Sequence, residues 1–283
     1  MNPPSDPVPP RMPDATLSPV LSPSPHHGVG LARLAVALGI LALYVLVPAI
    51  LGAGRTTHDS AILPPTVRGV LLLSAWELTL FTIAFAVCVL LGRLRLDELL
   101  LRWRGGWWPL PRGLAWSIAL RFGVGLFLVG SLLLWRFLSG SAPESLGGLR
   151  PQIESMVDVS ALRNPWYLAV MLTIVSFVLA GFREELWRAG MLALLAKALP
   201  RAFGGRFGPW LALIPVALLF GLGHTAQGPV GVAATTLLGI GLGAIMLFHR
   251  SIWDAVLAHG FFNATTFALL PLLAEHFPEL LGG

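Results

Sequence analysis

Residues 165–188 read PWYLAVMLTIVSFVLAGFREELWR, an uncharged apolar run that ends in a cluster of charged side chains. The run from 165 to 183 is long enough for a helix to cross the roughly 30 Å hydrocarbon core of a bilayer, which takes about 17–25 residues. An ionisable side chain at the bilayer centre costs on the order of 2.5–3.5 kcal/mol on insertion scales. The stretch therefore predicts a membrane helix whose charged end, 183–188, marks a candidate functional site.

Further apolar stretches of similar length recur along the chain, at about 31–53, 69–92, 114–138, 209–226, 229–248 and 251–273. A shorter run at 186–199 can either continue the span before it or form a separate half-helix, so we expect seven or eight spans. Hydrophobic residues make up 55% of the 283 residues and charged residues only 12%, whereas soluble domains carry about 25% charged residues. We therefore predict an all-α fold, a polytopic transmembrane helical bundle. The same composition excludes coiled coils, disordered proteins and soluble disulfide scaffolds.

The chain divides into three regions. Residues 1–27 contain nine prolines and no apolar periodicity, which predicts a disordered Pro/Ser-rich tail. Residues 28–160 supply N-terminal transmembrane helices, and residues 161–283 form a second transmembrane region with most of the intramembrane polar groups.

Arginines are concentrated after the second span, at 93–112. The positive-inside rule places that loop, and with it the N-terminus, in the cytoplasm. We expect an integral, multi-pass protein of a bacterial cytoplasmic membrane, in contact with membrane lipids. Nucleic acid is not an expected partner, because no basic run is interleaved with aromatic residues.

Charged residues at the end of the fourth span form the first polar cluster. Glu184 and Arg188 are four residues apart, which places them on one face of a helix and allows an ion pair. Glu185 adds a second carboxylate. A straight helix over 165–183 would carry Glu184 to the membrane edge. Convergence with the later clusters therefore requires a tilted or late-starting helix that the 184–199 segment continues.

Two further polar clusters lie in spans closer to the C-terminus. Phe220 precedes His224 by one helical turn and can pack against its ring. His259 and Asn263 are also four residues apart, so they point into the same cavity. Two carboxylates, two imidazoles and a carboxamide in a low-dielectric bundle could perform acid–base chemistry and stabilise an oxyanion. The same groups could instead hold a metal, and each one alone could be a helix–helix hydrogen-bond partner.

Together the three clusters resemble the signature of the CAAX protease and bacteriocin-processing family of intramembrane proteases, called the CPBP or Abi family. Its motifs run Glu-Glu-x-x-x-Arg, Phe-x-x-x-His and His-x-x-x-Asn. The last two are similar in type, spacing and order to 220–224 and 259–263. The resemblance covers about 165–272 and makes 161–283 the expected catalytic region. The first motif departs from the pattern, because Arg188 comes one residue early.

Two alignments of the first motif follow from that departure. If the carboxylate pair sets the alignment, Glu184 occupies the position of the catalytic glutamate and Glu185 the second position. If Arg188 sets it, Arg183 fills the catalytic position, which would argue against activity. Adjacent helical residues point about 100° apart, so the two alignments direct different side chains into the cavity. We adopt the first alignment, because it retains the acid at the expected place.

The resemblance implies a glutamate-type intramembrane endopeptidase that hydrolyses a peptide bond in a peptide or membrane-protein substrate. Glu184 and His224 would activate a water, while His259 and Asn263 would stabilise the oxyanion. The expected catalytic residues are Glu184, Glu185, His224, His259 and Asn263, with Arg188 and Phe220 in support.

Two alternatives to a metal-free protease stay open. We expect no cofactor, because the chain lacks the His-Glu-x-x-His zinc motif, but Glu184, His224 and His259 could together bind zinc. The second alternative is a transporter, or an immunity or scaffold protein on the same fold without catalysis. Glu77 and Arg121 are intramembrane charges outside the clusters, and they could pair with each other or line a pathway.

Overall fold

The computed structural model describes residues 29–52, 61–103, 105–140 and 151–277. Within these ranges the chain forms helices joined by turns, and no strand occurs. The tail predicted for 1–27 lies outside the described residues.

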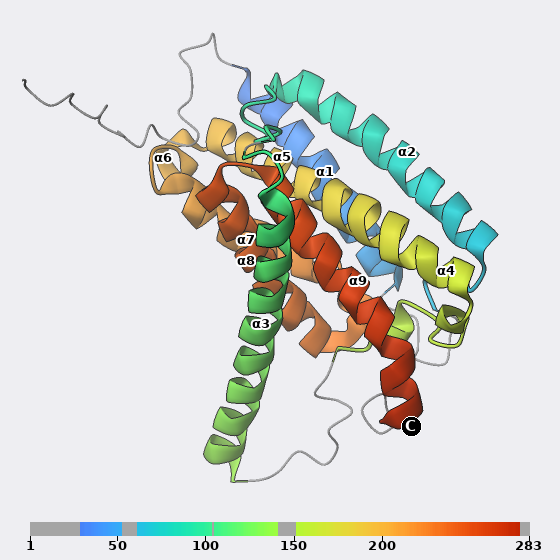
Figure 1. Ribbon diagram of the computed structural model, residues 1–283. Helices are drawn as coiled ribbons and strands as arrows, with labels where there is room; N and C mark the ends of the chain where they lie inside the picture. The colour runs from blue at the N-terminus through green and yellow to red at the C-terminus, as the bar shows by residue number, and fades with distance from the viewer. Residues whose placement is uncertain (1–28, 53–60, 104, 141–150, 278–283) are drawn as a thin grey trace, which may run out of the picture.

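The described helices pack side by side into one bundle (Figure 1). The α-helices are α1 (Leu31–Gly52), α2 (Val67–Gly92), α3 (Pro109–Ser139), α4 (Pro165–Val170), α5 (Glu184–Ala198), α6 (Pro200–Phe203), α7 (Gly208–Leu222), α8 (Gly228–His249) and α9 (Ile252–His276). A π-helix, η4 (Met171–Arg183), joins α4 to α5. Short 3-10 turns are η2 (Ile153–Ser155), η3 (Ala161–Arg163) and η5 (Thr225–Gln227).

Six of the described helices are long and apolar enough to cross a membrane, when 165–198 is counted as one helix and η5 is joined to α8. The 15-residue α7 is a seventh, shorter apolar helix. Each predicted span corresponds to one of these helices, which confirms the polytopic helical bundle. The run at 186–199 continues the fourth helix and adds no span of its own.

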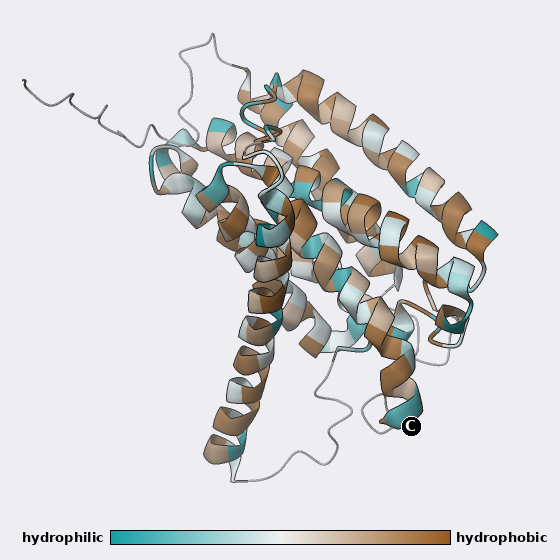
Figure 2. Ribbon diagram, viewed as in Figure 1, coloured by the Kyte–Doolittle hydropathy of each residue, from teal (hydrophilic) through white to brown (hydrophobic). Residues whose placement is uncertain are grey.

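Apolar side chains cover much of the outside of the bundle (Figure 2). The far half of α3 extends away from its neighbours (Figure 1), and Leu126 and Phe137 on it are 75% and 83% exposed. Exposed apolar surface of this extent is unusual for a soluble monomer. Lipid contact accounts for it, so the long apolar helices belong to an integral, multi-pass membrane protein.

The fourth membrane helix is continuous from 165 to 198, a length of 34 residues. It begins at a regular cap, where Asn164 Oδ1 accepts hydrogen bonds from the two backbone N–H groups after Pro165. Its central part is the π-helix η4, and Glu184 opens α5 directly after it. Glu184 therefore lies near the middle of a long helix, which brings the carboxylate pair inside the bundle.

Two glycines allow the η4 segment to approach α9 closely. A Cβ added at Gly260 would lie 2.2 Å from the Phe177 ring, and one at Gly181 would lie 2.9 Å from the carbonyl oxygen of Val256. Small residues at helix–helix interfaces are a common means of close packing in membranes. This contact holds the helix of Glu184 against the helix of His259.

Candidate active site

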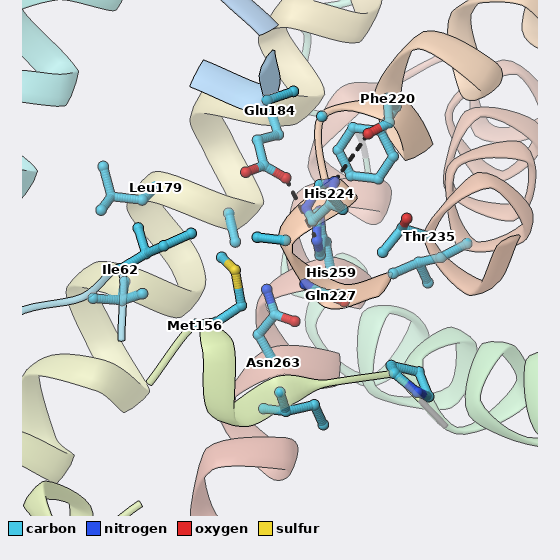
Figure 3. A pocket seen from close by; sticks show the side chains of 18 of the residues that line it. Ile62, Met156, Leu179, Glu184, Phe220, His224, Gln227, Thr235, His259 and Asn263 are labelled. Carbon is cyan, nitrogen blue, oxygen red and sulfur yellow. Dashed lines mark hydrogen bonds and ion pairs between the residues drawn. The ribbon is translucent and has the colours of Figure 1, made fainter. Parts of the chain in front are cut away.

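A cavity of about 720 Å³ lies between the helices, and four of the five predicted catalytic residues line it. These residues are Glu184, His224, His259 and Asn263 (Figure 3). Two connecting segments, at 62–63 and 151–156, also contribute to its wall. They are joined by backbone hydrogen bonds, from Ile62 N to Ser155 O and from Leu63 N to Met156 O, each 3.0 Å long.

Glu184 presents its carboxylate to this cavity, toward the two histidines (Figure 3). One oxygen, Oε1, is bound by Arg183 Nη2 at 2.9 Å. The other, Oε2, lies 3.8 Å from His259 Nε2 and has no hydrogen-bond partner among the described residues. Glu184 therefore has one oxygen held by a cation and one buried oxygen that lacks a hydrogen-bond partner among the described residues.

Glu185 points away from the cavity and is fully buried. Its Oε1 accepts a hydrogen bond from His259 Nδ1 at 3.0 Å, and its Oε2 forms an ion pair with Arg188 three residues later. The ion pair that the sequence spacing allows between Glu184 and Arg188 therefore does not form. Side chains at neighbouring helical positions point about 100° apart. The rotation of α5 about its axis places Arg188 next to Glu185 rather than Glu184.

His224 lies directly after α7, between that helix and η5. Its Nδ1 lies 2.9 Å from the carbonyl oxygen of Phe220, one helical turn earlier. Because a carbonyl oxygen only accepts hydrogen bonds, Nδ1 carries the proton in this contact and Nε2 is left unprotonated in the neutral ring. The buried Phe220 ring lies 4.8 Å from the His224 ring, as the sequence predicts, and restricts its orientation.

His259 and Asn263 both come from α9, one turn apart. His259 Nδ1 donates to Glu185, so its Nε2 faces Glu184. Asn263 lines the cavity beside the histidines (Figure 3). The three polar clusters, which are separated by up to 79 positions in the sequence, thus converge on one space.

Arg188 is buried on all sides and connects two of the clusters. It pairs with Glu185, and its guanidinium carbon lies 4.5 Å from the centre of the Phe220 ring. Glu185 in turn orients His259, and Phe220 packs on His224. Arg188 therefore acts on both histidines through an intermediate side chain.

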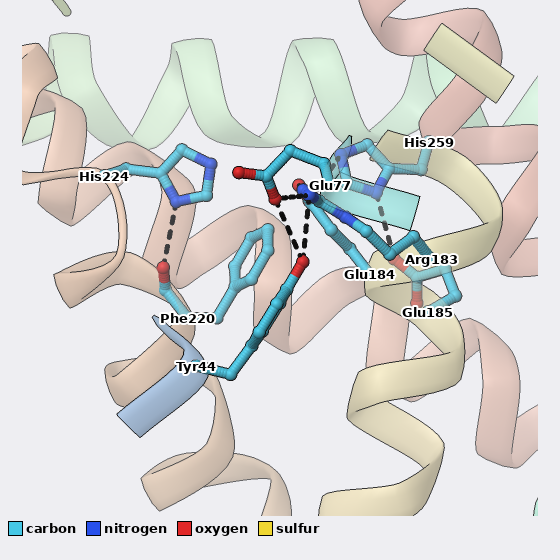
Figure 4. A network of polar contacts seen from close by, with 8 residues as sticks. All are labelled: Tyr44, Glu77, Arg183, Glu184, Glu185, Phe220, His224 and His259. Carbon is cyan, nitrogen blue, oxygen red and sulfur yellow. Dashed lines mark hydrogen bonds and ion pairs between the residues drawn. The ribbon is translucent and has the colours of Figure 1, made fainter. Parts of the chain in front are cut away.

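A second polar network adjoins Glu184 (Figure 4). Arg183 Nη1 binds Glu77 Oε2 at 2.7 Å, and Nη2 of the same guanidinium binds Glu184. Tyr44 donates to Glu77 at 3.1 Å and also lies 3.2 Å from Arg183 Nη1. Arg183 is thus shared between two carboxylates that both face the cavity.

Glu77 and Arg121 do not pair with each other, although both line the cavity. Arg121 instead donates from Nη2 to the carbonyl oxygen of Phe262 at 2.6 Å and to Thr266 Oγ1 at 3.2 Å. The pairing considered from the sequence is therefore wrong. Both side chains line one cavity, and the alternative that they line a pathway stays a prediction.

No group of three or more His, Cys, Asp or Glu side chains is arranged to hold a metal ion in the part of the chain that the structure describes. The alternative zinc ligands, Glu184, His224 and His259, line one cavity without forming such a group.

A comparison with protein families points to the same segment of the chain. Residues 165–265 match the family model of the type II CAAX prenyl endopeptidase, Rce1-like. This segment contains all three polar clusters. The match is consistent with a protease of the CPBP family. No curated protein and no solved structure matches the chain. At the family level the match supports a CAAX-type intramembrane protease.

In this chain Arg188, which comes one residue earlier than in the CPBP motif, pairs with a glutamate without displacing Glu184 from the cavity. Glu185 and Arg188, three residues apart, still meet on one face of α5. Arg183 also reaches the cavity wall, but as an ion-pair partner of Glu184 rather than in its place. The geometry thus agrees with the alignment set by the carboxylate pair.

Sequence reasoning missed the part of Tyr44 in this site. It is one of only two tyrosines in the chain and lies within an otherwise apolar span. A polar hydroxyl in such a span was the feature of the sequence that could have indicated its role. The contacts of Arg183 were also missed, because the sequence does not reveal that Glu77 of α2 faces the same space.

Proposed function

We propose that this CPBP-family chain is a glutamate-dependent endopeptidase that hydrolyses a peptide bond within the membrane without a metal. One observation carries the proposal. The Glu184 carboxylate faces two imidazoles in a single cavity, and its Oε2 is free of hydrogen bonds from the described residues. A carboxylate that lines a cavity beside two histidines, with one oxygen left without a hydrogen-bond partner, suits the activation of a water.

Glu184 is the proposed general base. It takes a proton from a water while the water oxygen attacks the carbonyl carbon of the peptide. The C–N bond then breaks, and the same proton passes from Glu184 to the leaving nitrogen. The products are a carboxylic acid and an amine, and the Glu184 carboxylate is restored. His224 is suited to orient the water, because Nε2 of its neutral ring accepts a hydrogen bond while Nδ1 is committed to Phe220.

His259 and Asn263 are the proposed stabilisers of the oxyanion. The Asn263 amide can donate to it directly. Because His259 Nδ1–H is committed to Glu185, Nε2 can donate only when the ring carries both protons. Two carboxylates, at 3.0 Å and 3.8 Å from the ring nitrogens, supply the counter-charge for that form. The proposed role of Glu185 is to position His259, with Arg188 fixing Glu185.

The test uses the purified full chain in detergent micelles with a library of prenylated and unprenylated peptides, and mass spectrometry detects the products. We expect Glu184→Gln to lower the cleavage rate by about 100-fold or more, the range of general-base catalysis. Glu275→Gln is the matched control, because Glu275 lies on the exposed end of α9. Cleavage by the Glu184→Gln variant at the wild-type rate would overturn the proposal.

Metal analysis of the active enzyme tests the metal-free part of the proposal. We expect full activity at a metal content far below one ion per chain. Stoichiometric zinc that is lost together with activity on chelation, and restores activity on return, would select the zinc-dependent alternative with Glu184, His224 and His259 as ligands.

A further inference from the structure

Basic side chains gather at the end of the bundle where α2, α5 and α8 end and α1, α3 and α9 begin (Figure 1). Hydrogen bonds join the segments that meet there. Lys197 at the end of α5 donates from Nζ to the carbonyl oxygen of Arg93, and Ser251 ahead of α9 donates from Oγ to that of Arg102. Charges that are far apart in the sequence therefore share one surface, which we call the basic end.

Positive charge at the basic end exceeds the carboxylates available to it. Each described carboxylate there already forms an ion pair, and the pairs are Asp97–Arg102, Glu98–Lys197 and Asp254–Arg112. The basic side chains left without a carboxylate among the described residues are Arg33, Arg93, Arg95, Arg201, Arg206 and Arg250. At the opposite end the described charges are balanced, with Arg68, Arg136 and Arg163 against Glu154, Asp158 and Glu275. The basic end can therefore bind anions from outside the chain.

Two of these arginines end helices in a backbone conformation that favours glycine. Arg93 follows the last turn of α2 with a φ of 47°, and Arg250 follows that of α8 with a φ of 53°. Glycine is the usual residue at such helix ends, because a side chain strains the left-handed conformation. The positive-inside rule concerns how many arginines a loop carries and does not explain a strained position. Backbone strain of this kind often accompanies a functional side chain.

Tryptophans place the basic end at the depth of the lipid headgroups. Trp107 and Trp108 directly precede α3, and they are 64% and 56% exposed. Their rings stack on each other, with centroids 4.6 Å apart. Exposed tryptophans at the ends of membrane helices lie at the boundary between hydrocarbon and headgroups. The arginines of the same end therefore lie where lipid phosphates are found.

We propose that the basic end binds the headgroups of anionic phospholipids in the surrounding membrane, with Arg93 and Arg250 as central contacts. Basic residues next to membrane helices attract anionic lipids, and each one adds to the affinity. The guanidinium group also fits a phosphate, because it can donate two parallel hydrogen bonds. The inference is independent of the proposed endopeptidase function, since none of these arginines lines the cavity.

The first test measures lipid binding to the purified full chain in neutral detergent micelles by native mass spectrometry. Phosphatidylglycerol and phosphatidylcholine with the same acyl chains are compared, so that only the headgroup differs. We expect phosphatidylglycerol to bind about fivefold more tightly or more, the effect of one basic residue beside an anionic surface. Raising the ionic strength tenfold should reduce this preference by screening. Equal affinities, or a preference unaffected by salt, would overturn the inference.

Variants at the helix ends assign the preference to the basic end. In the double variant Arg93→Gly/Arg250→Gly we expect the preference to fall to about one, because two central cations are lost. Its melting temperature in detergent should stay unchanged or rise, since glycine suits the left-handed conformation. The matched control is Arg136→Gln/Arg163→Gln, which removes the same charge at the opposite end and should keep the wild-type preference. An equal loss in this control would contradict the proposed location.

A second double variant covers a failure of the helix ends to fold. Arg95→Gln/Arg201→Gln changes exposed side chains of the basic end and should also lower the preference for phosphatidylglycerol. A preference that survives in both double variants of the basic end would overturn the inference.

Inorganic phosphate distinguishes a lipid-binding surface from a site for free anions. We expect phosphate at the same concentration as the lipid to leave the binding of phosphatidylglycerol unchanged, because it lacks the acyl chains that hold a headgroup at the membrane surface. Displacement of the lipid at that concentration would indicate a site for free phosphate and overturn the proposed lipid surface.

Discussion

Adjacent glutamates in this chain have different surroundings and, we propose, different tasks. Glu184 reaches the cavity with one oxygen free, whereas Glu185 is buried between Arg188 and His259. A buried ion pair of this kind adds little net stability, but removing one partner leaves an uncompensated charge. The pair therefore matters mainly for holding His259 in place.

A double-mutant cycle on Glu185 and Arg188 tests this role. We expect Arg188→Met alone to destabilise the protein by about 3–5 kcal/mol, because Glu185 would be left buried and unpaired. Adding Glu185→Gln should restore part of that loss, measured as the melting temperature in detergent. Glu98→Gln, which removes a partly exposed ion pair with Lys197, should change stability by about 1 kcal/mol or less. Additive effects of the two buried changes would contradict the expected coupling.

The sharing of Arg183 between two carboxylates leads to a prediction for Glu77. In Glu77→Gln the guanidinium loses one anionic partner and binds Glu184 more tightly. We expect the cleavage rate to fall by about tenfold, the effect of strengthening one charge-assisted hydrogen bond to the general base. The rate constant is measured at saturating peptide. An unchanged rate would show that Arg183 does not restrain Glu184. Proton-coupled transport without any peptide cleavage, abolished by this variant, would favour the transporter alternative.

At the scale of the helices, the site depends on the close contact between η4 and α9. The π-helix changes the rotation of the chain just before Glu184, and single-turn π segments in other proteins often occur at functional sites. Gly181 and Gly260 let the two helices approach, so the carboxylates of one helix can reach the histidine of the other.

Gly260→Ala tests that contact. The added methyl group would collide with the Phe177 ring, and overpacking of this kind costs about 1–3 kcal/mol. We expect a lower melting temperature and slower cleavage, because α9 would move away from Glu184. Gly125→Ala on α3 is the matched control, since nothing lies within 4 Å of its added Cβ. It should be neutral or gain about 0.5–1 kcal/mol of helix stability. Full activity in Gly260→Ala would show that the site tolerates a wider spacing.

At the scale of the whole molecule, a bundle with an apolar exterior surrounds a mostly apolar cavity into which a few charged side chains face (Figures 2 and 3). The ionisable groups that are buried inside the bundle, such as Glu185 and Arg188, interact in a lower dielectric than water, which strengthens their pairing. Four charged side chains that line the cavity, Glu77, Arg121, Arg183 and Glu184, come from three different membrane helices. The cytoplasmic placement of the N-terminus stays a prediction from the arginine distribution.

The amino-acid sequence by itself determined the membrane helices, because hydropathy and length are local properties that need no knowledge of packing. It also identified the three polar clusters, since residues four apart share a helix face wherever the helix lies. Only the tertiary structure decided which glutamate faces the cavity, that Arg183 joins Glu77 to Glu184, and that Arg121 is left without a carboxylate. These contacts depend on how each helix is rotated about its axis. That rotation is set by side-chain packing between segments far apart in the sequence. One example is the Phe177 ring, which packs directly against the backbone of Gly260.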